Sequence, residues 1–279
     1  MKGTVHILND NLTNTTPSIV DLDSRVVPVN NLDNSPDVNV NVNFDFNDFN
    51  DTFKCNKENY NEDIKPNNKN KDNFNNVITI NSYISYYYTN IDQLAIKSTN
   101  KMEELKLIVS DEKPDLIGIT EILSKNNKDF TPAELKLTGY DCFYTEDTFE
   151  RGTVLYVKKS LNGCKFNEFD DIGFKESTWA SFRTVNDEKI LVGCIYRRGK
   201  STEENLNNLK LIMNSKKLNT FDRVLIAGDF NFPNIDWQNG TSSDHLGEIF
   251  LEAINNAYLV QHVNKPTRIK NDQKETFLI

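Results

Sequence analysis

The stretch RVLIAGDFNFPNIDW, residues 223–237, decides the fold prediction for this chain. It opens with an apolar run, which is typical of a buried strand. The run stops at Gly228 and Asp229, and Asn231 and Pro233 follow at once. A buried strand that ends in a carboxylate needs polar partners there, because a charge is costly to bury alone. Other polar residues are therefore expected to converge on Asp229.

The sequence around this stretch predicts strands mixed with helices. Apolar and β-branched runs predict strands. They lie at residues 83–89, 115–120, 140–146, 152–159, 177–184, 189–197 and 223–229. Apolar residues at helical spacing predict helices at 100–114, 203–215 and 245–257. Hairpin-like strand pairs together with strand–helix–strand units indicate α/β sheets covered by helices.

Residues 1–76 differ from the rest of the chain. They contain 20 asparagines and 12 acidic residues and show almost no apolar periodicity. The stretch NSPDVNVNVNFDFNDFND, residues 34–51, alternates as a strand would, but Asn and Asp favour turns over strands. We therefore expect a disordered tail over 1–76 rather than a small ordered domain, with the folded domain at 77–279.

Charge and composition exclude some function classes. The formal net charge is −9, which argues against a protein that coats or packages nucleic acid. It does not exclude a nuclease, since a bound divalent metal can serve the phosphates. No apolar run reaches membrane-spanning length and the start has no signal-peptide core, so we expect an intracellular protein without a membrane partner. The cysteines at 55, 142, 164 and 194 show no metal-ligand spacing and are interpreted as free thiols.

Polar residues stand at the ends of four predicted strands. They are Asn90, Glu121, Tyr196, and Asp229 with Asn231. Each alone has a structural explanation, as a turn cap, an exposed carboxylate or a polar edge of the core. Because ligands of α/β sheets gather beyond strand ends, their joint placement predicts one shared cleft.

Several motifs in order carry a family resemblance. They are YYYTN (86–90), GITE (118–121), RGTVLYVKKSL (151–161), ESTWASF (176–182), LVGCIYR (191–197), AGDFNFPNIDW (227–237) and VNKPTR (263–268). Over about residues 83–279 the chain resembles the endonuclease domain of non-LTR retrotransposons, within the endonuclease/exonuclease/phosphatase superfamily. The resemblance implies a two-sheet, four-layer α/β sandwich.

The resemblance also implies a role for each strand-end residue. Glu121 would hold Mg²⁺ or Mn²⁺, with Asn90 beside it. Asp229 would take a proton from the attacking water, and Asn231 would fix Asp229 or donate to phosphate. Tyr196 would donate its hydroxyl to the phosphoryl group as charge develops. The implied substrate is DNA, nicked to prime reverse transcription, which places the active protein in the nucleus.

The sequence departs from the family pattern at its C-terminal end. The family closes with an Asp-bearing strand and a Ser-Asp-His triplet, whereas this sequence ends in KETFLI. The triplet at 243–245 opens a predicted helix, where Ser243 or Asp244 is better interpreted as an N-cap than His245 as a catalytic residue. We therefore expect a sandwich without its last strands and an impaired activity. A catalytically inactive remnant, or another phosphodiesterase or phosphatase of the superfamily, is the alternative.

The loop after Tyr196 also differs from the family, with YRRG at residues 196–199. Arg197 and Arg198 could meet phosphate, but exposed arginines without a function are common, and this second interpretation is favoured.

Overall fold

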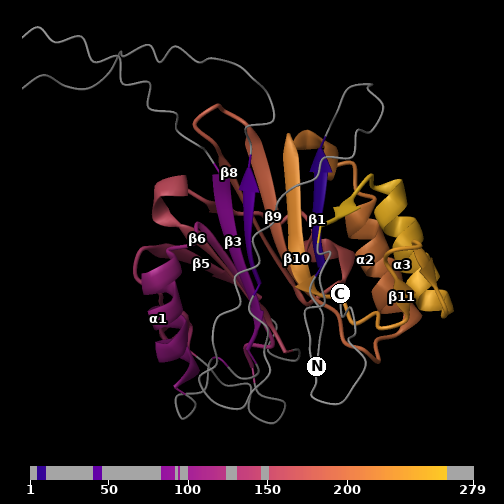
Figure 1. Cartoon of the computed structure of the whole chain (residues 1–279), viewed down its shortest axis with the longest axis horizontal. Helices are drawn as coiled ribbons and strands as arrows, with labels where there is room; N and C mark the ends of the chain where they lie inside the picture. The colour runs from indigo at the N-terminus through magenta and orange to yellow at the C-terminus, as the bar shows by residue number, and fades with distance from the viewer. Residues whose placement is uncertain are drawn as a thin grey trace, which may run out of the picture.

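The computed structural model describes residues 5–10, 40–45, 83–91, 94, 100–123, 131–145 and 151–262. Two large sheets pack face to face, and helices cover their outer faces (Figure 1). The predicted four-layer α/β sandwich is confirmed. Among the described residues, no helix is long and apolar enough to span a membrane.

The first sheet has five strands in the order β2-β3-β4-β6-β5. Their bounds are Val40–Asp45 (β2), Tyr83–Asn90 (β3), Leu116–Thr120 (β4), Tyr140–Tyr144 (β5) and Thr153–Lys158 (β6). Strands β3 and β4 run parallel, and the other neighbours are antiparallel. Since β6 runs opposite to β4, the start of β6 lies beside the end of β4.

The second sheet has six strands in the order β13-β1-β10-β9-β8-β7. Their bounds are Val5–Asp10 (β1), Cys164–Lys165 (β7), Ser177–Arg183 (β8), Lys189–Tyr196 (β9), Arg223–Asp229 (β10) and Val260–Gln261 (β13). Strands β9 and β10 are parallel neighbours in the middle of this sheet. A separate hairpin pairs β11 (Ile235–Asp236) with β12 (Thr241–Ser242).

In the described part of the chain, three helices form the outer layers. Helix α1 (Lys101–Glu112) packs on the five-stranded sheet, while α2 (Glu203–Met213) and α3 (His245–Asn256) cover the six-stranded sheet (Figure 1). Short 3₁₀ turns lie at Pro132–Leu135 (η2), Lys159–Leu161 (η3), Asp170–Ile172 (η4) and Leu218–Thr220 (η5). Between the sheets, tyrosines of β3 and leucines of β4 and β6 meet small and apolar residues of β8, β9 and β10.

Two strands lie where the sequence predicted a disordered tail. Strand β2 falls within the alternating stretch at 34–51, and β1 lies near the N-terminus. Backbone pairing explains both, because β1 pairs with β10 and β2 with β3. The structure thus has a strand over part of the alternating stretch. The remainder of 1–76 lies outside the described residues, so its disorder stays a prediction.

Candidate active site

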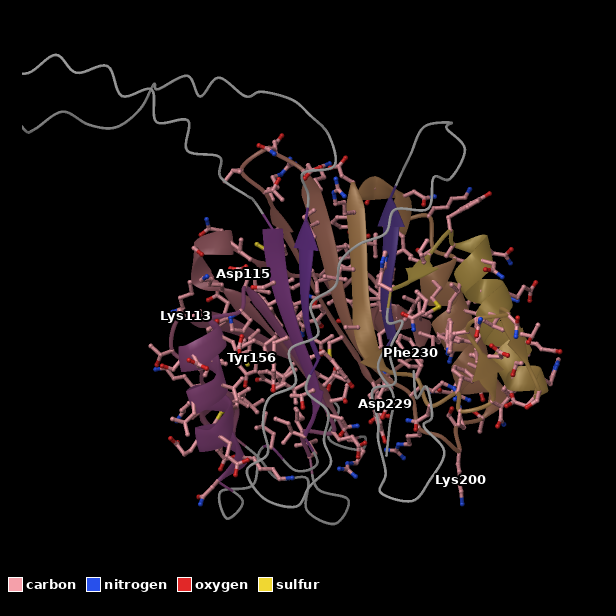
Figure 2. All side chains as sticks on the ribbon, in the orientation of Figure 1. Lys113, Asp115, Tyr156, Lys200, Asp229 and Phe230 are labelled. Atoms are coloured by element: carbon pink, nitrogen blue, oxygen red, sulfur yellow. The ribbon has the colours of Figure 1, made fainter. Side chains whose placement is uncertain are left out.

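The strands that end in polar residues all end at one edge of the sandwich. In the first sheet, Asn90 lies opposite Thr120, the residue before Glu121. In the second sheet, Asp229 lies opposite Tyr196. Figure 2 shows Asp229 at the lower end of β10, in the same lower part of the view as Lys200, whereas Asp115 lies higher, at the start of β4. Parallel pairing in each sheet therefore brings the predicted residues to a common edge.

Asn90 connects the two sheets at this edge. Its Nδ2 atom donates to Glu121 Oε1 at 2.8 Å and to Asp229 Oδ2 at 3.1 Å. Glu121 belongs to the first sheet's edge and is 4% exposed, while Asp229 ends β10 and is fully buried. Two buried carboxylates from different sheets thus face one amide.

The backbone at Glu121 is left-handed, with φ of 61°. This conformation is uncommon for a residue with a long side chain and is held only where the surroundings demand it. Here the start of β6 holds it, since the Glu121 amide donates to the Gly152 carbonyl at 3.1 Å and Leu123 donates to the Arg151 carbonyl at 2.9 Å. The turn directs the Glu121 carboxylate toward Asn90.

A buried arginine pairs with Glu121. Arg151 NH2 lies 2.9 Å from Glu121 Oε2, and each side chain is 5% exposed. The Arg151 amide donates to Glu176 Oε1, and Glu176 Oε2 lies 3.5 Å from Arg198 Nε. Glu176 precedes β8 of the second sheet. The series Glu121, Arg151, Glu176 and Arg198 therefore leads from the first sheet to the second with charges of alternating sign.

The turn after Asp229 is held by reciprocal hydrogen bonds with Arg197. Asn231, with φ of 52°, donates from its backbone to Asp229 Oδ1 at 3.2 Å and from Nδ2 to the Arg197 carbonyl at 2.6 Å. Arg197 NH1 donates to the Phe230 and Asn231 carbonyls at 3.2 and 3.3 Å, and its guanidinium stacks 4.0 Å from the Phe232 ring centre. Arg197 is therefore a buried part of the turn, at 2% exposure, and the expectation that it is exposed was wrong.

Electrostatics at this edge follow from burial and from the nearby carboxylates. Burial lowers the pKa of Arg197 to about 10, opposed by the negative charges of Asp244 and Asp229, so the guanidinium is cationic at neutral pH. Burial, and then the charge of Asp229, raises the pKa of Tyr88, whose hydroxyl shares a 2.8 Å hydrogen bond with Thr120. Tyr88 therefore stays a neutral phenol beneath the two carboxylates.

The donor set fits a hard divalent cation. Within the described part of the chain, no three His, Cys, Asp or Glu side chains form a cluster that could hold a metal ion. Glu121 and Asp229 supply carboxylate oxygens, and Asn90 supplies an amide. Mg²⁺ is commonly held by one or two carboxylates and keeps several waters, so this set suits Mg²⁺ or Mn²⁺ rather than a soft metal.

The predicted residues fall in two groups. Asn90, Glu121 and Asp229 are joined by side-chain hydrogen bonds. Asn231 reaches Asp229 through its backbone amide, and Tyr196 lies beside Asp229 as its strand partner. Their catalytic roles stay predictions.

The Ser-Asp-His triplet at 243–245 is where the capping prediction placed it. Asp244 is the N-cap of α3, and its Oδ1 accepts from the Gly247 amide at 2.8 Å. His245 is the first residue of the helix and is exposed. The predicted N-cap is confirmed.

Sequence reasoning missed Arg151 and Glu176. Both occur in quoted motifs, at the first position of RGTVLYVKKSL and of ESTWASF. What brings Arg151 to the site is strand register, which the apolar pattern does not fix: an arginine placed just before an antiparallel strand falls beside the end of its neighbour. That neighbour is β4, which leads into Glu121.

A comparison with known protein families gives a match for the C-terminal part of the chain, which contains the second sheet's half of the candidate site. Residues 190–278 match the endonuclease-reverse transcriptase family. Over these residues the match agrees with the family resemblance that the motifs predicted. The matched segment runs from β9 onward and contains Tyr196, Asp229 and Asn231 of the candidate site. A search of curated proteins finds no match.

Three solved structures are among those similar to this chain. Humanised TDP2 of D. rerio is 18% identical, with 53% of this chain and 62% of that chain covered and a TM-score of 0.39. AP endonuclease LMAP of Leishmania major is 15% identical, with 62% and 66% covered and a TM-score of 0.45. The 3′ phosphatase NExo of Neisseria, bound to a product DNA hairpin, is 14% identical, with 61% and 70% covered and a TM-score of 0.43. The chain spans less than two thirds of the first two.

Proposed function

We propose that this chain hydrolyses phosphodiester bonds in DNA with a bound Mg²⁺ ion, as the endonuclease of a retrotransposon. One observation carries the proposal: two buried carboxylates from different sheets, Glu121 and Asp229, converge on the amide of Asn90 at the edge where the strands end. The match of residues 190–278 to an endonuclease-reverse transcriptase family supports the retrotransposon assignment.

The residues divide the chemistry between them. Asp229 would accept the proton of a water whose oxygen forms the new bond to phosphorus, while the bond to the sugar oxygen breaks. Asn90 and the Asn231 amide each donate to one Asp229 oxygen, so the carboxylate of the proposed base is oriented before substrate binds. Glu121, with Asn90 beside it, would hold the cation, which offsets the charge that develops on phosphate. Tyr196, next to Asp229 in register, would donate to that phosphate.

Plasmid nicking tests this function. Residues 1–279 contain Ser-Asp-His only at 243–245, which opens α3. We expect residues 1–279 to nick plasmid in Mg²⁺ less than a version extended by such a triplet, because each transition-state donor contributes roughly 10²–10³ in rate. We expect nicking of supercoiled plasmid once a related endonuclease's C-terminal Ser-Asp-His segment is appended.

Variants of the appended protein assign the residues. Asp229→Asn and Glu121→Gln should each abolish nicking, while His245→Ala should leave it intact. Nicking that survives Asp229→Asn would contradict the assigned base. Absence of nicking from both proteins would favour the second candidate, a catalytically inactive relative.

A further inference from the structure

The ion pair between Arg151 and Glu121 stands out because both partners are buried and one is the proposed metal carboxylate. Arg151 NH2 lies 2.9 Å from Glu121 Oε2, and Asn90 donates to the other oxygen, Oε1. Arg151 is 4% exposed, in contrast to Arg183, whose ion pair with Asp187 lies on the surface. A carboxylate buried this deeply requires a counter-charge, and Arg151 supplies it in this structure.

The position of Arg151 is built into the sheet. The Arg151 carbonyl accepts from the Leu123 amide, and the next carbonyl, of Gly152, accepts from the Glu121 amide. The Arg151 amide donates in turn to Glu176. Three backbone hydrogen bonds of Arg151 and Gly152 therefore keep the arginine next to Glu121.

We propose that Arg151 is the resident counter-ion of Glu121 and competes with the divalent cation for that carboxylate, which weakens metal binding while keeping the metal-free site folded. This rests on the proposed function, because it takes Glu121 as the metal carboxylate. A metal that binds Glu121 must share it with a fixed positive charge, and like charges repel strongly where water is excluded. In the absence of metal, the same charge offsets the negative charge of a carboxylate that is 4% exposed.

Two variants separate charge from shape. Arg151→Gln removes the charge and keeps a polar side chain, whereas Arg151→Lys keeps the charge. We expect Arg151→Gln to lower the metal-free melting temperature by roughly 10 °C, since it removes the cation of a buried ion pair. We expect its Kd for Mn²⁺, measured by calorimetry, to tighten about tenfold. Arg151→Lys should keep the wild-type Kd, and Arg183→Gln should change neither quantity.

Adding Glu121→Gln to Arg151→Gln tests the pairing itself. With both charges removed, the metal-free melting temperature should recover part of its loss, and Mn²⁺ binding should disappear. A Kd that tightens equally in Arg151→Lys would overturn the proposal, because the charge would then not be the cause.

The remaining outcomes are also decisive. If Arg151→Gln folds only with Mn²⁺ added, the metal has replaced the arginine as counter-ion and the proposal stands. If Arg151→Gln stays unfolded with excess Mn²⁺, or folds and binds Mn²⁺ no more tightly than wild type, the proposal about Arg151 fails. The proposed function still stands in that case, provided that the wild-type protein binds Mn²⁺. If neither wild type nor Arg151→Gln binds Mn²⁺, the metal-dependent function fails as well.

Discussion

At the scale of single residues, the candidate site depends on side chains that hold other side chains. Asp229 is held by Asn90 and by the Asn231 amide, and Asn231 is held in its left-handed turn by Arg197. Asparagine tolerates this backbone conformation better than most residues, which accounts for its place two residues after Asp229. The geometry of Asp229 therefore depends on Arg197, which the proposed chemistry does not use directly.

Arg197 gives the first prediction at this scale. Arg197→Met keeps much of the side-chain bulk but removes the donors to the Phe230 and Asn231 carbonyls. We expect the free energy of unfolding to fall by about 2–4 kcal/mol, since hydrogen bonds from a charged donor are each worth about 1.5–3 kcal/mol. Urea denaturation measures the change. Arg183→Met, at a surface ion pair, should cost less than about 1 kcal/mol. Equal losses in the two variants would show that the turn does not need Arg197.

The contrast between Asn231 and Arg151 shows which residues of the candidate site could be predicted from the sequence. Asn90, Glu121, Asp229 and Asn231 were predicted because each ends or follows a strand, and strand ends are visible in apolar patterning. Arg151 was not predicted, because its contact with Glu121 depends on antiparallel register between β4 and β6, which patterning does not fix. The burial of Arg197 was missed for a similar reason, since its partners are backbone carbonyls of a neighbouring turn.

At the scale of secondary-structure elements, strands rich in apolar residues were predictable and strands rich in asparagine were not. The strands β4, β5, β6, β8, β9 and β10 and the described helices α1, α2 and α3 lie within the predicted ranges, and β3 extends one residue beyond its range, to Asn90. Strand β2 alternates Val and Phe with Asn and Asp, so local propensity opposes a strand that pairing with β3 forms. Tertiary pairing outweighs propensity there.

The N-terminus of α3 gives a prediction for an element. Asp244→Ala removes the N-cap of this helix, so we expect the free energy of unfolding to fall by about 1 kcal/mol. His245→Ala, one residue on, should change it by less than about 0.5 kcal/mol. Urea denaturation at pH 7 measures both. A larger loss for His245→Ala would mean that the triplet has a role beyond capping.

The same cap predicts a pH dependence. The Gly247 amide, followed by the Asn234 side chain, holds the pKa of Asp244 below its usual range. A lowered pKa in the folded state adds stability above the unfolded pKa of about 3.9, and this is lost as pH falls through the folded value. The difference in unfolding free energy between wild type and Asp244→Ala should therefore narrow as pH falls from 7 to about 3. A difference that widens on acidification would contradict the assignment.

At the scale of the whole molecule, the candidate site exists only because two sheets keep a fixed separation. Glu121 belongs to one sheet and Asp229 to the other, and the 3.1 Å bond from Asn90 to Asp229 crosses between them. The layer between the sheets sets that separation, with bulky residues such as Tyr86 on one side and small ones such as Ala180 on the other. The layer under α2 and α3 lies on the far side of the second sheet and does not set it.

Two core substitutions distinguish the effects of these two layers on the site. Ala180→Leu adds volume between the sheets, and Leu209→Ala removes volume beneath α2, so both destabilise the protein, by about 1–3 and 2–5 kcal/mol respectively. Only Ala180→Leu should also push Asn90 away from Asp229, because close-packed interiors transmit such displacements. We therefore expect Mn²⁺ binding, measured by calorimetry, to weaken in Ala180→Leu and to keep the wild-type Kd in Leu209→Ala. Equal weakening in both would mean that metal binding follows global stability, and that the spacing of the sheets does not control the site.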